Sequence, residues 1–185
     1  MQHRFTPSGI SEAEAEKLTT ALQHRLYSLT DLALTLKHVH WNVVGPGFIA
    51  VHEMLDDHVE EVRLMVDDLA ERITTLGGIA NGLAGGLVRD REWNDYALGR
   101  AVVPAHLGAL DKVYDGIIGD HRRAMGIAED LDLVSHDMLV EQTGKLELFQ
   151  WFVRAHLENT AGELPTADEE GQLDAAAAAA LADHL

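Results

Sequence analysis

Residues 38–78 read HVHWNVVGPGFIAVHEMLDDHVEEVRLMVDDLAERITTLGG and decide the fold. The Gly-Pro-Gly of residues 45–47 cannot continue a helix, and the Gly-Gly of residues 77–78 marks the end of the next one. We therefore expect one helix over residues 11–42 and a second from residue 48 to about residue 76. A tight turn joins them.

This stretch contains five residues of the types that bind metal ions, namely His40, His52, Asp56, Asp67 and Glu71. On the second helix, His52 and Asp56 are four residues apart, as are Asp67 and Glu71, so each pair projects from one face. At a rise of about 1.5 Å per residue, Asp56 and Asp67 lie about 16 Å apart along the axis. One helix therefore cannot bring both pairs to one ion.

The apolar residues of the second helix form a separate stripe, made of Leu55, Val59, Val62, Val66, Leu69, Ile73 and Leu76. At about 100° per residue, the two pairs lie about 120° around from that stripe and do not face the bundle core. A second copy of the helix running antiparallel would bring Asp67 and Glu71 of one chain to His52 and Asp56 of the other. The alternative is that these polar residues are only a solvated surface.

The run HVHWNVVGPGFIAVHEMLD, followed by DDLAER, resembles the signature of the Dps family, the mini-ferritins also called DNA-binding proteins from starved cells. The resemblance implies an inter-subunit ferroxidase centre with His40, His52 and Asp56 on one side. By the same resemblance, Asp67 and Glu71 are expected to come from the two-fold partner. It also implies a ferritin-like four-helix bundle that assembles into a hollow homododecamer.

The resemblance further implies that Fe(II) is oxidised to Fe(III) by hydrogen peroxide or oxygen and stored as ferric mineral, protecting the cell from oxidative damage. Histidine nitrogen and carboxylate oxygen suit Fe(II), Mn(II) or Zn(II), which agrees with an iron-oxidising enzyme. Trp41 is a further candidate at this centre, either as a packing anchor or as a trap for stray oxidising equivalents. Glu60 and Arg63 lie near the same helix face and are candidates to contact the ligands and orient them.

The chain has 185 residues, 46% of them hydrophobic, which suits one domain with terminal extensions. We expect an extension at residues 1–10, the bundle at residues 11–162 and an acidic, alanine-rich tail at residues 163–185. The chain has no cysteine and no apolar run of membrane length. We expect a cytoplasmic protein, with nucleoid association as a further option.

The net charge of −17, from 14 basic and 31 acidic residues, repels polyanions and attracts cations. DNA binding requires clustered Lys or Arg to contact phosphates. The leading segment offers only Arg4 and Lys17, and no Lys or Arg follows Arg154. DNA binding is therefore doubtful, and a membrane partner is not expected.

The rest of the chain also predicts an all-α fold, with helices over residues 102–128 and 132–160. We expect a short extra helix at residues 95–98, within the long crossover that a ferritin-like bundle needs between its second and third helices. Ser11 with Glu14 predicts a capping box, and Asp132 predicts an N-cap. The predicted inward positions outside the second helix are Leu18, Leu22, Leu29, Leu32, Leu36, Val39, Leu107, Leu110, Val113, Tyr114, Ile117, Leu139, Leu146, Phe149, Phe152 and Val153.

The junction GIAEDLDLVSHD, residues 126–137, is acidic, which is typical of a solvated turn. Alternatively, it contributes to a pore that guides cations inward, for which Asp120, Asp132 and Asp137 are the candidates. The chain contains no Glu-x-x-His motif, so a di-iron site inside a single bundle is disfavoured. Two other functions stay open: a nucleoid DNA-binding protein, and a metal-dependent hydrolase that uses the same interface.

Overall fold

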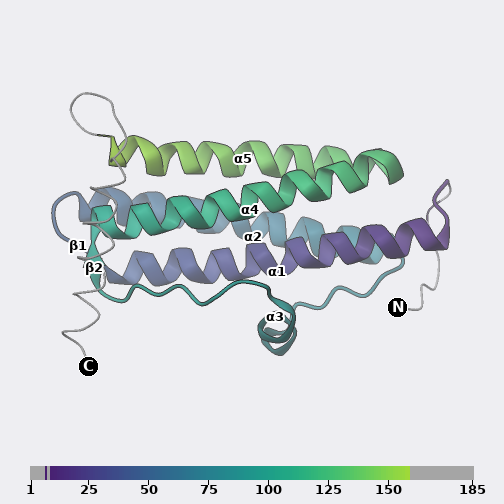
Figure 1. The fold of residues 1–185 in the computed structure, drawn as a ribbon, viewed down its shortest axis with the longest axis horizontal. Helices are drawn as coiled ribbons and strands as arrows, with labels where there is room; N and C mark the ends of the chain where they lie inside the picture. Colours follow the sequence, from purple (N-terminus) through teal and green to yellow (C-terminus); the bar gives the residue numbers. More distant parts are fainter. Residues whose placement is uncertain (1–6, 8, 159–185) are drawn as a thin grey trace.

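The computed structural model describes residue 7 and residues 9–158. The predicted tail at residues 163–185 and most of the predicted extension at residues 1–10 lie outside them. Four long helices form a bundle (Figure 1), confirming the predicted all-α, ferritin-like fold; they are α1 (Glu12–Asn42), α2 (Phe48–Thr75), α4 (Val103–Leu131) and α5 (Leu133–Leu157). The last helix ends three residues before the predicted position.

The helices pack as two antiparallel hairpins, α1 with α2 and α4 with α5, which meet chiefly where α1 contacts α4. The crossover from α2 to α4 runs along the length of α1, as Figure 1 shows, so that α4 starts at the same end as α2. Two short strands, β1 (Val43–Val44) and β2 (Ala101–Val102), pair in parallel beside the turn between α1 and α2. They tie the end of the crossover to the end of α1.

Side-chain caps fix two of the helix starts. Ser11 Oγ accepts a hydrogen bond from the Glu14 amide, and the Ser11 amide donates to Glu14 Oε2 at 2.8 Å, which is the predicted capping box. At the start of α5, Asp132 Oδ2 accepts from the Ser135 amide at 3.0 Å. Asp132 also bonds to Arg72 of α2, so this cap ties α5 to the other hairpin.

The core lies between the four helices along the predicted apolar stripes. All predicted positions of α1 and α2 are buried except Val66, which is partly buried. The same holds for α4 and α5, where Val113 and Phe152 are partly buried. Burial of these stripes is the main force holding the bundle together, because each buried aliphatic side chain contributes about 1.5–3 kcal/mol.

The short helix in the crossover was predicted at the wrong place. Residues 95–98 are not helical, and the helix is α3 (Ala84–Asp90), which lies across the outside of the bundle in Figure 1. Gly86 lets α3 lie against α1, because a Cβ there would come within 2.7 Å of the Tyr27 hydroxyl oxygen. Tertiary contact thus overrides the low helix propensity of glycine.

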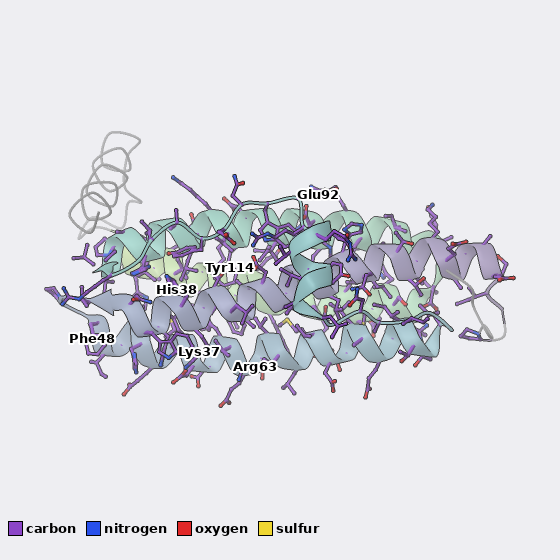
Figure 2. All side chains as sticks on the ribbon, turned by 90° about the horizontal axis from the view of Figure 1, so that it is seen from below. Lys37, His38, Phe48, Arg63, Glu92 and Tyr114 are labelled. Carbon is purple, nitrogen blue, oxygen red and sulfur yellow. The ribbon has the colours of Figure 1, made fainter. Side chains whose placement is uncertain are left out.

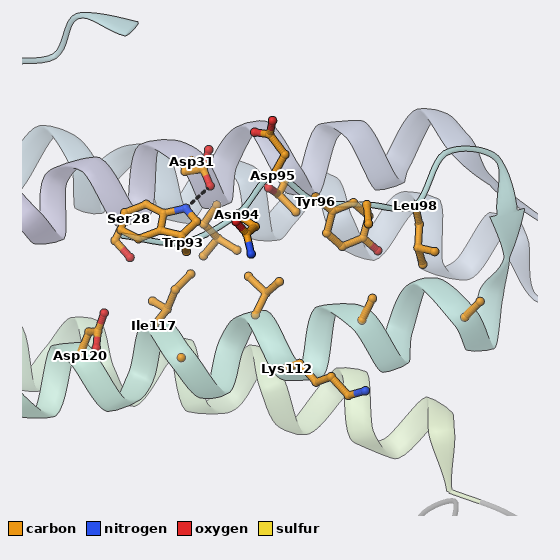
Figure 3. Close-up of a pocket in the computed structure, with 17 residues that line it drawn as sticks. Ser28, Asp31, Trp93, Asn94, Asp95, Tyr96, Leu98, Lys112, Ile117 and Asp120 are labelled. Atoms are coloured by element: carbon orange, nitrogen blue, oxygen red, sulfur yellow. Dashed lines mark hydrogen bonds between the residues drawn. The ribbon is translucent and has the colours of Figure 1, made fainter. Parts of the chain in front are cut away.

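The segment at residues 93–98 stays extended because its groups bond to α1 instead. Trp93 Nε1 donates to Asp31 Oδ2 at 2.6 Å, and His38 Nε2 lies 2.7 Å from the Leu98 carbonyl oxygen. Beneath this segment, between α1 and α4, is a largely apolar cavity of about 470 Å³ (Figure 3). None of the five candidate ligands lines it. Across residues 9–158, no helix is long and apolar enough to cross a membrane.

Besides His40, three histidines are buried that the sequence did not predict to be in the interior: His58, His106 and His121. Burial lowers the pKa of His58 and of His121 to about 4, because desolvation disfavours the imidazolium form. Repulsion from nearby Arg25 adds to the effect at His121. Both rings are therefore neutral at physiological pH.

Candidate metal centre

The turn between α1 and α2 brings His40 and His52 face to face. Gly45 and Gly47 hold positive φ values of 92° and 79°, a conformation that glycine adopts without strain, so the chain reverses within five residues. The two imidazole rings then stack with centroids 3.6 Å apart and an interplanar angle of 20°. Phe48, whose ring lies 5.4 Å from that of His52, sits at this end of the bundle (Figure 2).

Each of these histidines is held by the backbone of the other. His40 Nδ1 lies 2.9 Å from the His52 carbonyl oxygen, and His52 Nδ1 lies 2.9 Å from the His40 carbonyl oxygen. A carbonyl oxygen only accepts, so each Nδ1 carries the hydrogen and donates it. In the neutral ring the lone pair is then on Nε2, which is the atom offered to a metal.

Asp56 supplies a carboxylate beside the two rings. Its Oδ1 lies 3.3 Å from His40 Nδ1 and 2.7 Å from Lys37 Nζ. The hydrogen bond from Lys37 lowers the pKa of Asp56, burial acts in the opposite direction, and the positive charge of Lys37 adds to the lowering. The side chain is about half exposed, at 48%, and so this carboxylate stays ionised and accessible to a cation.

No role for Lys37 was predicted from the sequence. It lies three residues before His40 on α1, which places both side chains on one helix face. Its ammonium group is bonded to a candidate ligand and lies 5.8 Å from the centroid of the Trp41 ring. A cation is thus already present where a metal ion is expected to bind.

Asp67 and Glu71 do not join this cluster. Both are exposed on the same helix as His52 and Asp56, about three turns further along. Within the described part of a single chain, no group of three or more His, Cys, Asp or Glu side chains is arranged to hold a metal ion. One subunit therefore places His40, His52 and Asp56 near one another without arranging all three to hold an ion, and it leaves the acidic pair apart.

Trp41 is 71% exposed and does not pack into the core of the subunit. The expectation that it anchors the packing of its own subunit is therefore wrong, because its side chain points away from the bundle toward solvent. Its other predicted role, as a trap for oxidising equivalents, stays a prediction. Glu60 and Arg63 are exposed, and neither forms a hydrogen bond or ion pair with a candidate ligand in the described chain.

The three acidic candidates for a cation pore differ in what they contact. Asp120 pairs with Arg25 at 3.1 Å and with Arg123, and Asp132 is engaged as the cap of α5. Although burial opposes it, hydrogen bonds from Ser135 and Arg72 lower the pKa of Asp132. Asp137 is exposed. Of the three, Asp137 is the one whose carboxylate is not used to hold the fold together.

A four-helix bundle with one long crossover is the arrangement of the ferritin-like class. The model of the ferritin-like domain family matches residues 19–162. The chain belongs to this family, and within it to the Dps proteins. A DNA protection during starvation protein from Mycolicibacterium smegmatis is 54% identical over 168 residues, covering 91% of this chain and 90% of that protein.

Two further comparisons extend this finding. The solved structure of DpsA14 from Streptomyces coelicolor has a TM-score of 0.86 and 54% identity, covering 89% of this chain and 98% of that one. The fine tangled pili major subunit of Haemophilus ducreyi is 50% identical over 159 residues, covering 86% of this chain and 84% of that protein. Because similar chains carry such different names, the function is argued from the residues of the site.

Proposed function

We propose that this chain is the subunit of a Dps-like ferroxidase, which oxidises Fe(II) with hydrogen peroxide or oxygen and stores the ferric product in a hollow homododecamer. The observation that carries the proposal is the stacked pair His40 and His52, each fixed through Nδ1 so that Nε2 is available. With Asp56 beside them, they offer two nitrogen ligands and one carboxylate for Fe(II). Three protein ligands leave the coordination of an iron ion incomplete.

Asp67 and Glu71 of a two-fold partner would complete it. An antiparallel copy of α2 would place the acidic pair of one chain over the histidines of the other, and the two-fold axis would generate two equivalent centres per dimer. Exposed apolar residues around this face fit an interface, among them Trp41 at 71%, Ile49 at 55% and Leu64 at 59% exposure. The acidic pair would add negative charge, which stabilises the ferric product.

The chemistry requires two electrons for each hydrogen peroxide reduced to two hydroxide ions. Two Fe(II) ions bound side by side supply one electron each, so that no hydroxyl radical is released. Glu71 is our candidate to bridge them, because a carboxylate can bind through both oxygens. The part played by the protein is to position the two ions, to balance their charge and to exclude competing reactions.

The test is an anaerobic titration of Fe(II)-loaded protein with hydrogen peroxide. We expect two Fe(II) oxidised per peroxide and a low yield of hydroxyl radical. The double variant Asp67→Ala/Glu71→Ala should lose rapid oxidation while keeping its assembled size. The matched control is Glu53→Ala/Asp68→Ala, which removes the same charge from exposed positions of α2 outside the ligand set. Equal, slow oxidation in all three proteins would contradict the proposal.

Binding of DNA is the second candidate, since curated relatives are named for DNA protection. The net charge of −17 disfavours it, because phosphate contacts require clustered cations. We expect no retardation of plasmid DNA at about 150 mM salt. Salt-dependent retardation by the assembled protein would instead favour a nucleoid role. No observation favours the hydrolase.

A further inference from the structure

Tyr114 and His58 form an isolated polar pair deep in the bundle. Tyr114 has no exposed surface and His58 has 1%, and the Tyr114 hydroxyl oxygen lies 3.1 Å from His58 Nδ1. The two rings meet edge to face, at an interplanar angle of 83°. In Figure 2, Tyr114 lies within the body of the bundle, away from its ends. The candidate metal centre does not use this pair.

The direction of this hydrogen bond follows from counting donors. If His58 Nδ1 donated, the phenol hydrogen would have no acceptor, and Nε2, which has no hydrogen-bond partner within the described part of the chain, would also be left with an unused lone pair. If Tyr114 donates, only the hydrogen on Nε2 is unpaired. Since each unsatisfied buried group costs about 1–3 kcal/mol, the phenol is the donor and Nδ1 the acceptor. The phenol proton is therefore aimed at a base.

A row of aromatic rings links this pair to the surface. The ring of His58 stacks on Phe149 at 4.0 Å and lies 6.1 Å from Phe152. Phe152 in turn lies 5.2 Å from Trp151, which is 58% exposed. An electron can thus move from the buried tyrosine toward an oxidised surface tryptophan through neighbouring rings. The path starts on α4, crosses α2 and ends on α5.

We propose that Tyr114, with His58 as its proton acceptor, is a radical-holding site that takes up one-electron oxidising equivalents and returns them to Fe(II). The oxidant is hydroxyl radical, formed when peroxide meets a single Fe(II). Tyr114 gives one electron to reduce hydroxyl radical to hydroxide, and its phenol proton moves to His58 Nδ1. A neutral tyrosyl radical and an imidazolium result. One further Fe(II) then returns an electron as the proton goes back, leaving Fe(III).

The location of the pair suits this role. Full burial shields the radical from solvent and from other macromolecules, and burial also raises the pKa of Tyr114, which keeps the phenol protonated until it is oxidised. His58 lies on α2, the helix that carries Asp56. The helix that carries a candidate Fe(II) ligand therefore also carries the proton acceptor of the radical site. The role in iron chemistry rests on the proposed ferroxidase function, whereas the radical site itself does not.

The first experiment is independent of iron. Metal-free protein is oxidised with photoexcited ruthenium tris(bipyridine) and persulfate, and the products are frozen for electron paramagnetic resonance. We expect a tyrosyl signal that is lost in Tyr114→Phe and retained in Tyr27→Phe and Tyr96→Phe, which remove the only other tyrosines. Tyr96 is the sharpest control, because its hydroxyl oxygen also lies 3.0 Å from a histidine nitrogen, Nδ1 of His106. A signal that persists in Tyr114→Phe overturns the proposal.

Two further measurements test the radical site without the Tyr114→Phe variant, which could fail to fold. In wild-type protein labelled with ¹⁵N-histidine, we expect the tyrosyl radical to couple to one histidine nitrogen and to one exchangeable proton. Absence of both couplings would contradict the assignment of His58 as proton acceptor. Trp151→Phe should slow formation of the radical, whereas Trp93→Phe, a change at a tryptophan of the crossover that does not belong to this row of rings, should not. Equal rates in these two variants would overturn the surface path.

The second experiment adds iron. Limiting Fe(II) with excess peroxide should produce the same Tyr114 signal, and a later addition of Fe(II) should remove it. Tyr114→Phe should then release more hydroxyl radical, measured with a spin trap, at an unchanged initial rate of iron oxidation. If iron oxidation is slow in every protein while the photochemical signal persists, the ferroxidase proposal fails and the radical site stands. If iron oxidation is fast but no tyrosyl signal forms in either experiment, the radical site is wrong.

Discussion

His40 and His52 hold each other in place: the Nδ1 atom of each ring lies 2.9 Å from the backbone carbonyl oxygen of the other residue. The pair of bonds crosses the turn between α1 and α2, so the orientation of both rings is part of the fold. Both Nε2 atoms are therefore set before any metal arrives. Little rearrangement is needed to bind one, which favours affinity.

Lys37 competes with iron for Asp56, because its ammonium group lies 2.7 Å from Asp56 Oδ1. Lys37→Gln removes a positive charge from the edge of the centre. We expect Fe(II) to bind about three- to tenfold more tightly, which corresponds to the roughly 1 kcal/mol expected between neighbouring unit charges in water. Anaerobic calorimetry of Fe(II) binding measures the change.

The control for this prediction is Lys17→Gln, which removes the same charge from an exposed position near the other end of α1. Weaker binding in Lys37→Gln than in Lys17→Gln would show that the lysine orients the carboxylate for the metal rather than competing with it.

Asp132 joins the two hairpins, since it caps α5 through the Ser135 amide and bonds to Arg72 of α2. Asp132→Ala removes the cap and leaves the partly buried Arg72 without this partner. We expect the free energy of unfolding to fall by about 1–3 kcal/mol. Thermal and denaturant unfolding report it. Asp137→Ala, at an exposed position of the same helix, should change stability much less, and equal effects would refute a special role for Asp132.

His121 makes the fold sensitive to acid. Burial holds its pKa at about 4, whereas the unfolded chain binds a proton near pH 6.5. Below that pH the unfolded state takes up a proton that the folded state does not, so stability falls as the pH falls toward 4. Between about pH 7 and about pH 5, this group alone accounts for a loss of about 2 kcal/mol.

The variant that tests this is His121→Gln, with His24→Gln at an exposed site of α1 as its control. Unfolding free energies are measured across this pH range. His121→Gln should flatten the pH dependence even if it lowers stability at pH 7, while His24→Gln should keep the wild-type slope. Parallel curves for wild type and His121→Gln would contradict the assignment.

The long helices followed from local chemistry. The Ser11–Glu14 capping box, the Asp132 cap and the apolar stripes at helical spacing each act over a few residues, so the sequence alone contains them. The position of the helix in the crossover could not be predicted from local chemistry. Its position depends on the close approach of Gly86 to Tyr27 of α1, and that contact between residues 59 positions apart in the chain leaves no local pattern.

The candidate ligands could be predicted from their spacing and from the family resemblance. The contacts around them could not. The exchange of backbone hydrogen bonds between His40 and His52 depends on the shape of the turn, and the Lys37–Asp56 pair depends on how α1 packs on α2. The buried His58 was missed because a histidine on an apolar face breaks the hydrophobic pattern. Only the packed bundle reveals that Tyr114 is its partner.

The central claim is that each metal centre is shared between two subunits. Its most direct test mixes two inactive chains in one assembly: a His40→Ala/His52→Ala chain and an Asp67→Ala/Glu71→Ala chain, co-expressed with different tags and purified together. A dimer of the two contains one centre in which Asp56 is the only ligand left and one with every ligand intact.

With random pairing, half of the dimers are mixed, so we predict that rapid Fe(II) oxidation by peroxide returns to about a quarter of the wild-type level. Each variant assembled alone should stay inactive, and so should the two shells mixed after assembly. If the co-assembled protein gains no activity over its parents, the two halves of the centre do not meet across subunits and the account is wrong.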